Sequence, residues 1–208
     1  MPSSPYDEAL RKRLSAQLGG FDRQAIADPA LRPAAVAIVL VPDGDGRPAF
    51  LLTRRASKLR RHSGQWALPG GRLDAGESHV QGALRELREE IDVSLDEPDV
   101  LGLLDDYPTR SGFVITPVVL WGERASKPRP DPREVASVHR VPVAELAKPG
   151  VPRLRYIPES ERPVISIPIV GTHVHAPTAA LLYQLVEVAF RGRPTRVAHF
   201  EQPVFAWR

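Results

Sequence analysis

The chain has 208 residues, 42% of them hydrophobic, and a formal net charge of +3, which fits one globular domain with its own core and excludes a disordered chain. It contains no cysteine, which excludes a disulfide framework and any thiolate metal site or nucleophile. A charge of +3 is too small to predict nucleic-acid binding, and no apolar stretch is long enough for a membrane span or a signal peptide. We therefore expect a single domain over 1–208 in the cytoplasm, monomeric or homodimeric, that binds neither nucleic acid nor membrane.

The first third of the chain predicts a helix followed by a β-hairpin. Leu10, Leu14 and Leu18 recur at the spacing of one helix face. The β-branched run AAVAIVLV is typical of a buried strand, and the turn residues PDGDGRP separate it from a second apolar run, AFLLT. The expected elements are a helix at 7–18 inside an N-terminal helical extension, 1–33, a strand at 34–41 and its hairpin partner at 49–53.

The second half of the chain mixes strand and helix patterns without strict alternation. This mixture favours an α/β fold in which helices cover a mixed β-sheet. Proline breaks the pattern at 149–165, and that segment is left unassigned. The expected elements are strands at 100–107, 112–122 and 134–143, a proline-rich loop at 127–133, a helical turn at 143–147, a C-terminal helix at 177–190 and an extended end at 196–208.

The segment 78–91 has a helical period and carries a cluster of carboxylates. Its apolar face is formed by four residues at helical spacing: Val80, Leu84, Leu87 and Ile91. Glu86, Glu89 and Glu90 fall together on a neighbouring face, since residues three and four apart on a helix are neighbours. Many such clusters are simply solvated helix faces, and that reading stays open here.

A divalent cation would explain the cluster better. Glu86 and Glu90 are like charges at i, i+4 and repel each other, while Arg85 and Arg88 are expected on other sides of the helix. Mg²⁺ takes oxygen ligands and is typically held by one or two carboxylates together with substrate phosphates. The double glycine before the helix would let backbone approach such a ligand closely.

The stretch from Gly70 to Asp92 resembles the Nudix box, G-x5-E-x7-R-E-U-x-E-E-x-G-U, in which U is aliphatic. The matching residues are Gly71, Glu77, Arg85, Glu86, Leu87, Glu89, Glu90 and Val93. One position departs: Asp92 stands where the pattern has a glycine. That glycine would end the helix in the left-handed conformation, which Asp adopts less readily than Gly but more readily than most residues. The departure removes no metal ligand.

The resemblance implies an α/β/α sandwich with a mixed sheet. It also implies hydrolysis of a nucleoside diphosphate linked to another group, with Mg²⁺ or Mn²⁺ as cofactor. Glu86, Glu89 and Glu90 would be metal ligands, and the Gly70 carbonyl a further one. Glu86 or Glu89 would also act as general base.

Three further roles follow from the resemblance. Arg85 would hold the carboxylates by charge-assisted hydrogen bonds, and Glu77 would complete that brace. Some Nudix enzymes take their base from a later loop, and Glu134 is the candidate for that role here. A plain charge at the edge of a strand is an equally good interpretation of Glu134.

The segment before the box resembles the signature of the coenzyme A pyrophosphatase branch, L-L-T-x-R-[SA]-x3-R-x3-G-x3-[FL]-P-G-G. The matching residues are Leu51, Leu52, Thr53, Arg55, Ala56, Arg60, Gly64, Leu68, Pro69, Gly70 and Gly71. By this resemblance, the residues expected at the substrate are Arg55, Arg60, Gly64, Trp66 and Gly71. Coenzyme A carries a 3′-phosphate besides its pyrophosphate, and an arginine-rich loop suits such anions. Trp66 would stack on the adenine or pack the loop.

Two alternatives stay open. The substrate could be another nucleoside diphosphate derivative, such as ADP-ribose or NADH, because any such enzyme needs cations near the phosphates. The protein could also be a binding or regulatory protein without turnover, although such proteins usually lose the glutamates that this chain keeps. His173 and His175 would share one face of a strand, and without a third ligand nearby they are expected to be structural.

Overall fold

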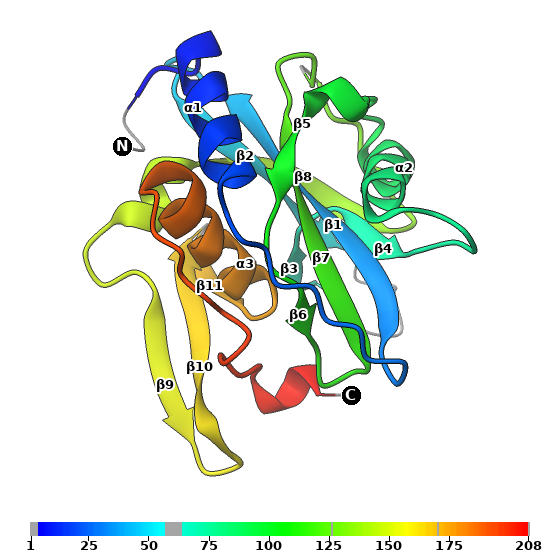
Figure 1. Ribbon diagram of the computed structural model, residues 1–208, viewed down its shortest axis with the longest axis vertical. Helices are drawn as coiled ribbons and strands as arrows, with labels where there is room; N and C mark the ends of the chain where they lie inside the picture. The colour runs from blue at the N-terminus through cyan, green and yellow to red at the C-terminus, as the bar shows by residue number, and fades with distance from the viewer. Residues whose placement is uncertain (1–3, 57–63, 126, 170, 208) are drawn as a thin grey trace.

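The computed structural model describes residues 4–56, 64–125, 127–169 and 171–207 (Figure 1). The helices are α1 (Glu8–Gly19), α2 (His79–Ile91) and α3 (Thr178–Leu185). Short helical turns are η1 (Glu97–Asp99), η2 (Val143–Ala147), η3 (Val186–Phe190) and η4 (Val204–Ala206). The strands are β1 (Arg32–Pro42), β2 (Pro48–Arg55), β3 (Trp66–Ala67), β4 (Gly70–Arg72), β5 (Val100–Leu103), β6 (Tyr107–Pro108), β7 (Phe113–Trp121), β8 (Val135–Pro142), β9 (Arg153–Ile157), β10 (Ser160–Ile169) and β11 (Thr172–His175).

In the described residues, eight strands form one mixed sheet around β1. β1 runs parallel to β7 over nine residue pairs, from Arg32 opposite Phe113 to Leu40 opposite Trp121. It runs antiparallel to β2, its hairpin partner, and to β4. β8 extends the sheet beyond β2. The expected hairpin and the mixed sheet are confirmed.

Residues of β1 alternate between two layers of core. Val39 packs in one cluster with Leu87 of α2, whereas Ile38 packs in a second cluster with Leu14 of α1 and Leu182 of α3. Successive side chains of a strand point to opposite faces, so a continuous apolar run indicates a strand buried on both sides. Figure 1 shows α2 on one side of the sheet and α1 and α3 on the other. This is the sandwich that the resemblance implied.

The strand expected at 100–107 is instead two strands, β5 and β6, with an irregular step between them. Asp105 and Asp106 are buried in this step. The Asp105 carboxylate accepts the backbone N–H of Gln24 at 2.8 Å, and the Asp106 carboxylate accepts that of Ile26 at 2.8 Å. Because buried carboxylates need such donors, the step fastens the segment after α1 to the sheet.

The unassigned segment at 149–165 forms β9 and most of β10, which join β11 in a second, three-stranded sheet. The C-terminal helix spans 178–190, as expected, but its last turn, η3, is π-helical. The end of the chain is not extended throughout: Glu201 bridges to Val164, and η4 follows as a 3-10 turn. Within the described residues, no helix combines the length and apolar character that crossing a membrane requires.

The glutamate helix, α2, has well-defined ends. Ser78 caps its start: the hydroxyl accepts the Gln81 backbone N–H, and the Gln81 side chain accepts the Ser78 backbone N–H. Asp92 ends it in the left-handed conformation, with φ 55° and ψ 38°. Among the described residues, Asp92 is the one non-glycine residue with positive φ. The chain therefore keeps the backbone geometry of the missing glycine.

Replacing Asp92 by glycine is expected to raise the free energy of unfolding by about 1 kcal/mol, because glycine adopts this conformation without steric cost. Asp92→Ala should lower the same quantity, since alanine lacks the local hydrogen bonding that helps Asp. Urea unfolding of the two variants checks the expectation, and equal stability of Asp92→Gly and Asp92→Ala would contradict it.

Candidate active site at the glutamate helix

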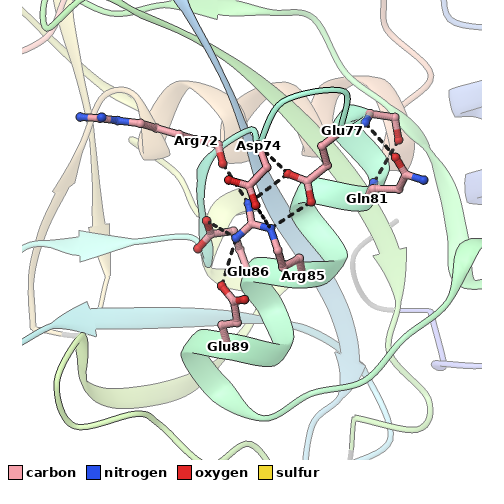
Figure 2. A network of polar contacts seen from close by, with 8 residues as sticks. Arg72, Asp74, Glu77, Gln81, Arg85, Glu86 and Glu89 are labelled. Atoms are coloured by element: carbon pink, nitrogen blue, oxygen red, sulfur yellow. Dashed lines mark hydrogen bonds and ion pairs between the residues drawn. The ribbon is translucent and has the colours of Figure 1, made fainter.

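Arg85 is the centre of a network of carboxylates on α2 (Figure 2). Its Nε donates to Glu77 Oε1 at 2.9 Å, and its Nη2 donates to Glu77 Oε2 at 3.1 Å. Its Nη1 donates to Glu86 Oε1 at 2.9 Å and to Glu89 Oε2 at 3.0 Å. Nη2 also donates to the Arg72 carbonyl of β4 at 2.9 Å. One guanidinium thus fixes the loop before the helix and two of its glutamates.

This geometry corrects the expectation that the glutamates have no counter-charge on their side of the helix. Arg85 is adjacent to Glu86 in sequence and four residues before Glu89, and its long side chain reaches both. The hydrogen bonds from Arg85 hold the pKa of Glu77 below its usual value. In return, Glu77 chiefly, and then Glu86, raise the pKa of Arg85. The sequence predicted the brace through the resemblance, and its contacts are present here.

Glu90 lies apart from this brace, and it is 3% exposed. Its Oε2 accepts the Gly70 N–H at 3.3 Å, and among the described residues the cation paired with it is Arg55, whose Nη1 is 3.9 Å from Oε1. Burial, and next the charge of Glu86, raise the pKa of Glu90 to about 8. Burial also raises the pKa of Glu86. Glu134, the residue before β8, adds its charge to the causes that raise the pKa of both groups. Its backbone carbonyl accepts the Ala56 N–H at 2.9 Å, one residue from Arg55.

Gly70 and Gly71 lie so close to neighbouring atoms that a side chain would not fit at either position. A Cβ on Gly70, whose φ is +155°, would collide with the Ala35 carbonyl and the Val36 backbone of β1. A Cβ on Gly71 would collide with the Glu86 carboxylate. The glycine at position 71 of β4 therefore leaves room for the Glu86 carboxylate of α2.

Alanine is expected to impair activity at position 71 and stability at position 70. Gly71→Ala meets only the flexible end of Glu86, so it should displace that carboxylate and lower kcat/KM about 10- to 100-fold with little loss of stability. Gly70→Ala meets backbone in a strained conformation, so it should lower the free energy of unfolding by about 2–5 kcal/mol. Thermal melts and initial rates on both variants separate the two effects. A fully active Gly71→Ala variant would show that the position of Glu86 is unimportant.

The donor chemistry of the site fits a divalent cation. Carboxylate oxygens and a backbone carbonyl are the hard ligands that Mg²⁺ prefers, and a cation would offset the buried charge shared by Glu86 and Glu90. Among the described residues, no three acidic or histidine side chains are arranged to share one ion. Glu89 is turned to Arg85 instead. The fit is therefore to an ion held by two carboxylates, with phosphate oxygens and water completing its shell.

A cavity of about 740 Å³ begins at these glycines. Four of the residues expected at the substrate line it: Arg55, Gly64, Trp66 and Gly71. Arg54 and Gly70 line it too, whereas Glu86, Glu89 and Glu90 do not. Arg60 lies outside the described residues. The cavity therefore joins an arginine-lined end to the edge of the carboxylate cluster.

Sequence reasoning missed the wall of the cavity that comes from distant segments. That wall includes Phe113, Gln202 and Phe205. His173 and His175, expected to be structural, share one face of β11, as expected, and also line the cavity. The local sequence of β11 and of the chain end does not indicate that these segments line a cavity, because the cavity forms where the second sheet meets the first.

A model of the NUDIX domain matches residues 31–160. "Uncharacterized Nudix hydrolase NudL" of Citrobacter koseri is 38% identical over 120 residues, which cover 57% of this chain and 62% of the relative. "Nudix hydrolase 22, chloroplastic" of Arabidopsis thaliana is 36% identical over 151 residues, which cover 69% of this chain and 48% of the relative. The chain thus spans less than two thirds of the length of these relatives.

Two solved structures share the fold. A MutT/nudix family protein from Enterococcus faecalis aligns with a TM-score of 0.52 at 15% identity, covering 80% of this chain and 63% of the other. A NUDIX hydrolase from Alicyclobacillus acidocaldarius aligns with a TM-score of 0.51 at 20% identity, covering 77% and 93%. At such identities the likeness concerns the fold alone.

Proposed function

The chain belongs to the NUDIX domain family, and from this premise we propose that it hydrolyses the pyrophosphate bond of coenzyme A or an acyl-CoA, with Mg²⁺ or Mn²⁺ as cofactor. The products from coenzyme A are 4′-phosphopantetheine and adenosine 3′,5′-bisphosphate. The observation that carries the proposal is the position of Gly71, which lines the arginine-lined cavity and also lies against the Glu86 carboxylate.

The residues of α2 divide the chemical work. Glu86 and Glu90 are the two carboxylates that would hold the cation, and the Gly70 carbonyl would join them. Glu89 would become a further ligand on leaving Arg85, to which it is hydrogen-bonded at 3.0 Å. When bound, the cation neutralises phosphate oxygens and lowers the pKa of bound water. Arg85 positions the carboxylates through the hydrogen bonds described above. Glu86, Glu89 or Glu134 accepts the proton of the attacking water at a carboxylate oxygen.

The arginines support a substrate with several phosphates. Arg54, Arg55 and Arg72 line the cavity next to Gly70 and Gly71. A guanidinium binds phosphate through two parallel hydrogen bonds, and coenzyme A offers a pyrophosphate and a 3′-phosphate. Arg55 also faces Glu90 across 3.9 Å, so it lies between the substrate cavity and the carboxylates. The upstream sequence motif that contains Arg55 favours coenzyme A over other nucleotides.

A panel of substrates tests the proposal. Coenzyme A, acetyl-CoA, ADP-ribose, NADH and 8-oxo-dGTP are incubated with the protein and Mg²⁺ or EDTA, and kcat/KM is determined by product chromatography. Coenzyme A or acetyl-CoA is expected to give the highest value. Cleavage of ADP-ribose or NADH alone would keep the catalytic helix and overturn the substrate. Cleavage of none would favour a binding protein.

The cytoplasmic location, the single domain over 1–208 and a monomeric or homodimeric state remain predictions of the sequence. Gel filtration of the purified protein tests the oligomeric state directly.

A further inference from the structure

We infer that the end of the cavity walled by Phe205 and β11 holds the nucleobase of the substrate, with the base stacked on the Phe205 ring. The inference rests on the proposed function for the presence of a nucleotide. It goes beyond that function because Phe205 and His175 lie outside the segment matched by the family model, 31–160.

The cavity has two chemically different ends. Arg54 and Arg55 belong to β2 of the first sheet, and Arg55 Nη1 lies 3.9 Å from the Glu90 carboxylate. Phe205 and His175 line the same cavity from η4 and β11, and β11 lies against β3 of the first sheet. A ligand whose phosphates lie at the first end therefore places the group attached to those phosphates toward the second end of the cavity. In a nucleotide that group is a ribose and a base.

The Phe205 ring has a face free for stacking. The residue is 58% exposed, although it lines the cavity. Its ring is 5.5 Å from that of His175 at an interplanar angle of 82°, so His175 covers at most one of its faces. Covering an exposed aromatic face with a flat base removes apolar surface from water, and every base has such a face.

The turn that carries Phe205 is held in place before any ligand binds. The buried carboxylate of Glu201 pairs with Arg110 of the first sheet's loop at 2.5 Å. The Gln202 side chain accepts the Arg110 backbone N–H at 2.7 Å, and the Gln202 backbone carbonyl accepts Trp207 Nε1–H at 2.9 Å. Because these contacts bracket η4, the ring needs little ordering on binding, which favours affinity.

The polar residues beside Phe205 in the cavity suit a nucleobase better than a flexible alkyl arm. His175 and Gln202 line the cavity beside Phe205, and a base offers hydrogen-bonding edges in the plane of its stacking face. Burial, and then the charge of His173, lower the pKa of His175, so its ring is neutral near pH 7. A neutral ring can be covered by a base without the desolvation cost of a charge.

Binding of AMP and of ribose 5-phosphate, two ligands that differ only in the base, tests the inference. Calorimetry with Mg²⁺ present is expected to show that the wild-type protein binds AMP at least about tenfold more tightly than ribose 5-phosphate. Phe205→Ala and Phe205→Leu should reduce this preference about fivefold or more, whereas Phe205→Tyr should keep it. Tyr156, an aromatic residue that is 73% exposed on β9 and does not line the cavity, is the matched control: Tyr156→Ala should keep the preference.

A reduction of the AMP preference by less than about fivefold in Phe205→Leu overturns the inference. So does a reduction in Tyr156→Ala equal to that in Phe205→Ala. So does a wild-type protein that binds both ligands equally. Because the measurement needs no turnover, it can fail independently of the proposed function. A protein that cleaves no substrate but shows a preference dependent on Phe205 would refute only the hydrolase, and active enzyme without that dependence would refute only the base site.

Discussion

Glu90→Gln is expected to lower kcat/KM for coenzyme A at least about 100-fold while leaving the free energy of unfolding unchanged or higher. Loss of groups that merely orient a metal ligand costs about 10- to 100-fold in metal affinity or activity, and a direct ligand should cost more. The stability expectation has a separate cause. Glu90 is buried with one weak backbone donor and an arginine 3.9 Å away. Because burial chiefly raises the pKa of its carboxyl to about 8, the folded protein must take up a proton there near pH 7, and a neutral amide removes that cost.

Glu97→Gln is the matched control, since Glu97 is an exposed carboxylate of η1, in the turn that follows α2 and Asp92. It should change neither rate nor stability by a measurable amount. Initial rates and urea unfolding of both variants make the comparison. A Glu90→Gln variant that turns over at the wild-type rate would refute Glu90 as a ligand, and one that is inactive because it is unfolded would refute the stability argument.

Arg85→Ala is expected to lower the free energy of unfolding by about 2–4 kcal/mol and also to impair activity strongly. The Arg85 side chain is 20% exposed, and those of Glu77 and Glu86 are 12% and 15% exposed. Removing the guanidinium leaves two largely buried carboxylates unpaired, which costs more than the loss of a surface ion pair. Activity falls because Glu86 and Glu89 lose the group that positions them.

Arg88→Ala provides the comparison on the same helix, because Arg88 is exposed. Its effect on unfolding should stay within about 0.5 kcal/mol. A double-mutant cycle between Arg85 and Glu77 should give a non-zero coupling energy, since the two side chains share two hydrogen bonds. Equal stability of Arg85→Ala and Arg88→Ala in urea unfolding would show that the brace is not structural.

The features that the sequence predicted well depend on local patterns. The helix at 78–91, its left-handed end at Asp92 and the hairpin of β1 and β2 each follow from residues within about a dozen positions of one another. Helical period, capping residues and turn residues are all written at that range. The contacts of Arg85 are different, because the helical period placed Arg85 away from the glutamates and only the resemblance implied the brace.

The features that the sequence did not predict depend on contacts between distant segments. The break between β5 and β6 exists because Asp105 and Asp106 accept hydrogen bonds from residues about 80 positions earlier. The second sheet gave no usable pattern because prolines interrupt it. The aromatic wall at Phe205 required the chain end to fold back onto the first sheet's loop through Glu201 and Arg110. No local period records any of these approaches.

The release of adenosine 3′,5′-bisphosphate from coenzyme A, followed by chromatography while Mg²⁺ is titrated into metal-free protein, tests the central claim most directly. We predict a rate that rises to saturation with Mg²⁺, falls to background with EDTA and returns when excess Mg²⁺ is added. A rate that is the same in EDTA, or no release at saturating Mg²⁺ from a folded protein, would contradict the claim that the glutamates beside Gly71 form a metal-dependent pyrophosphatase site for coenzyme A.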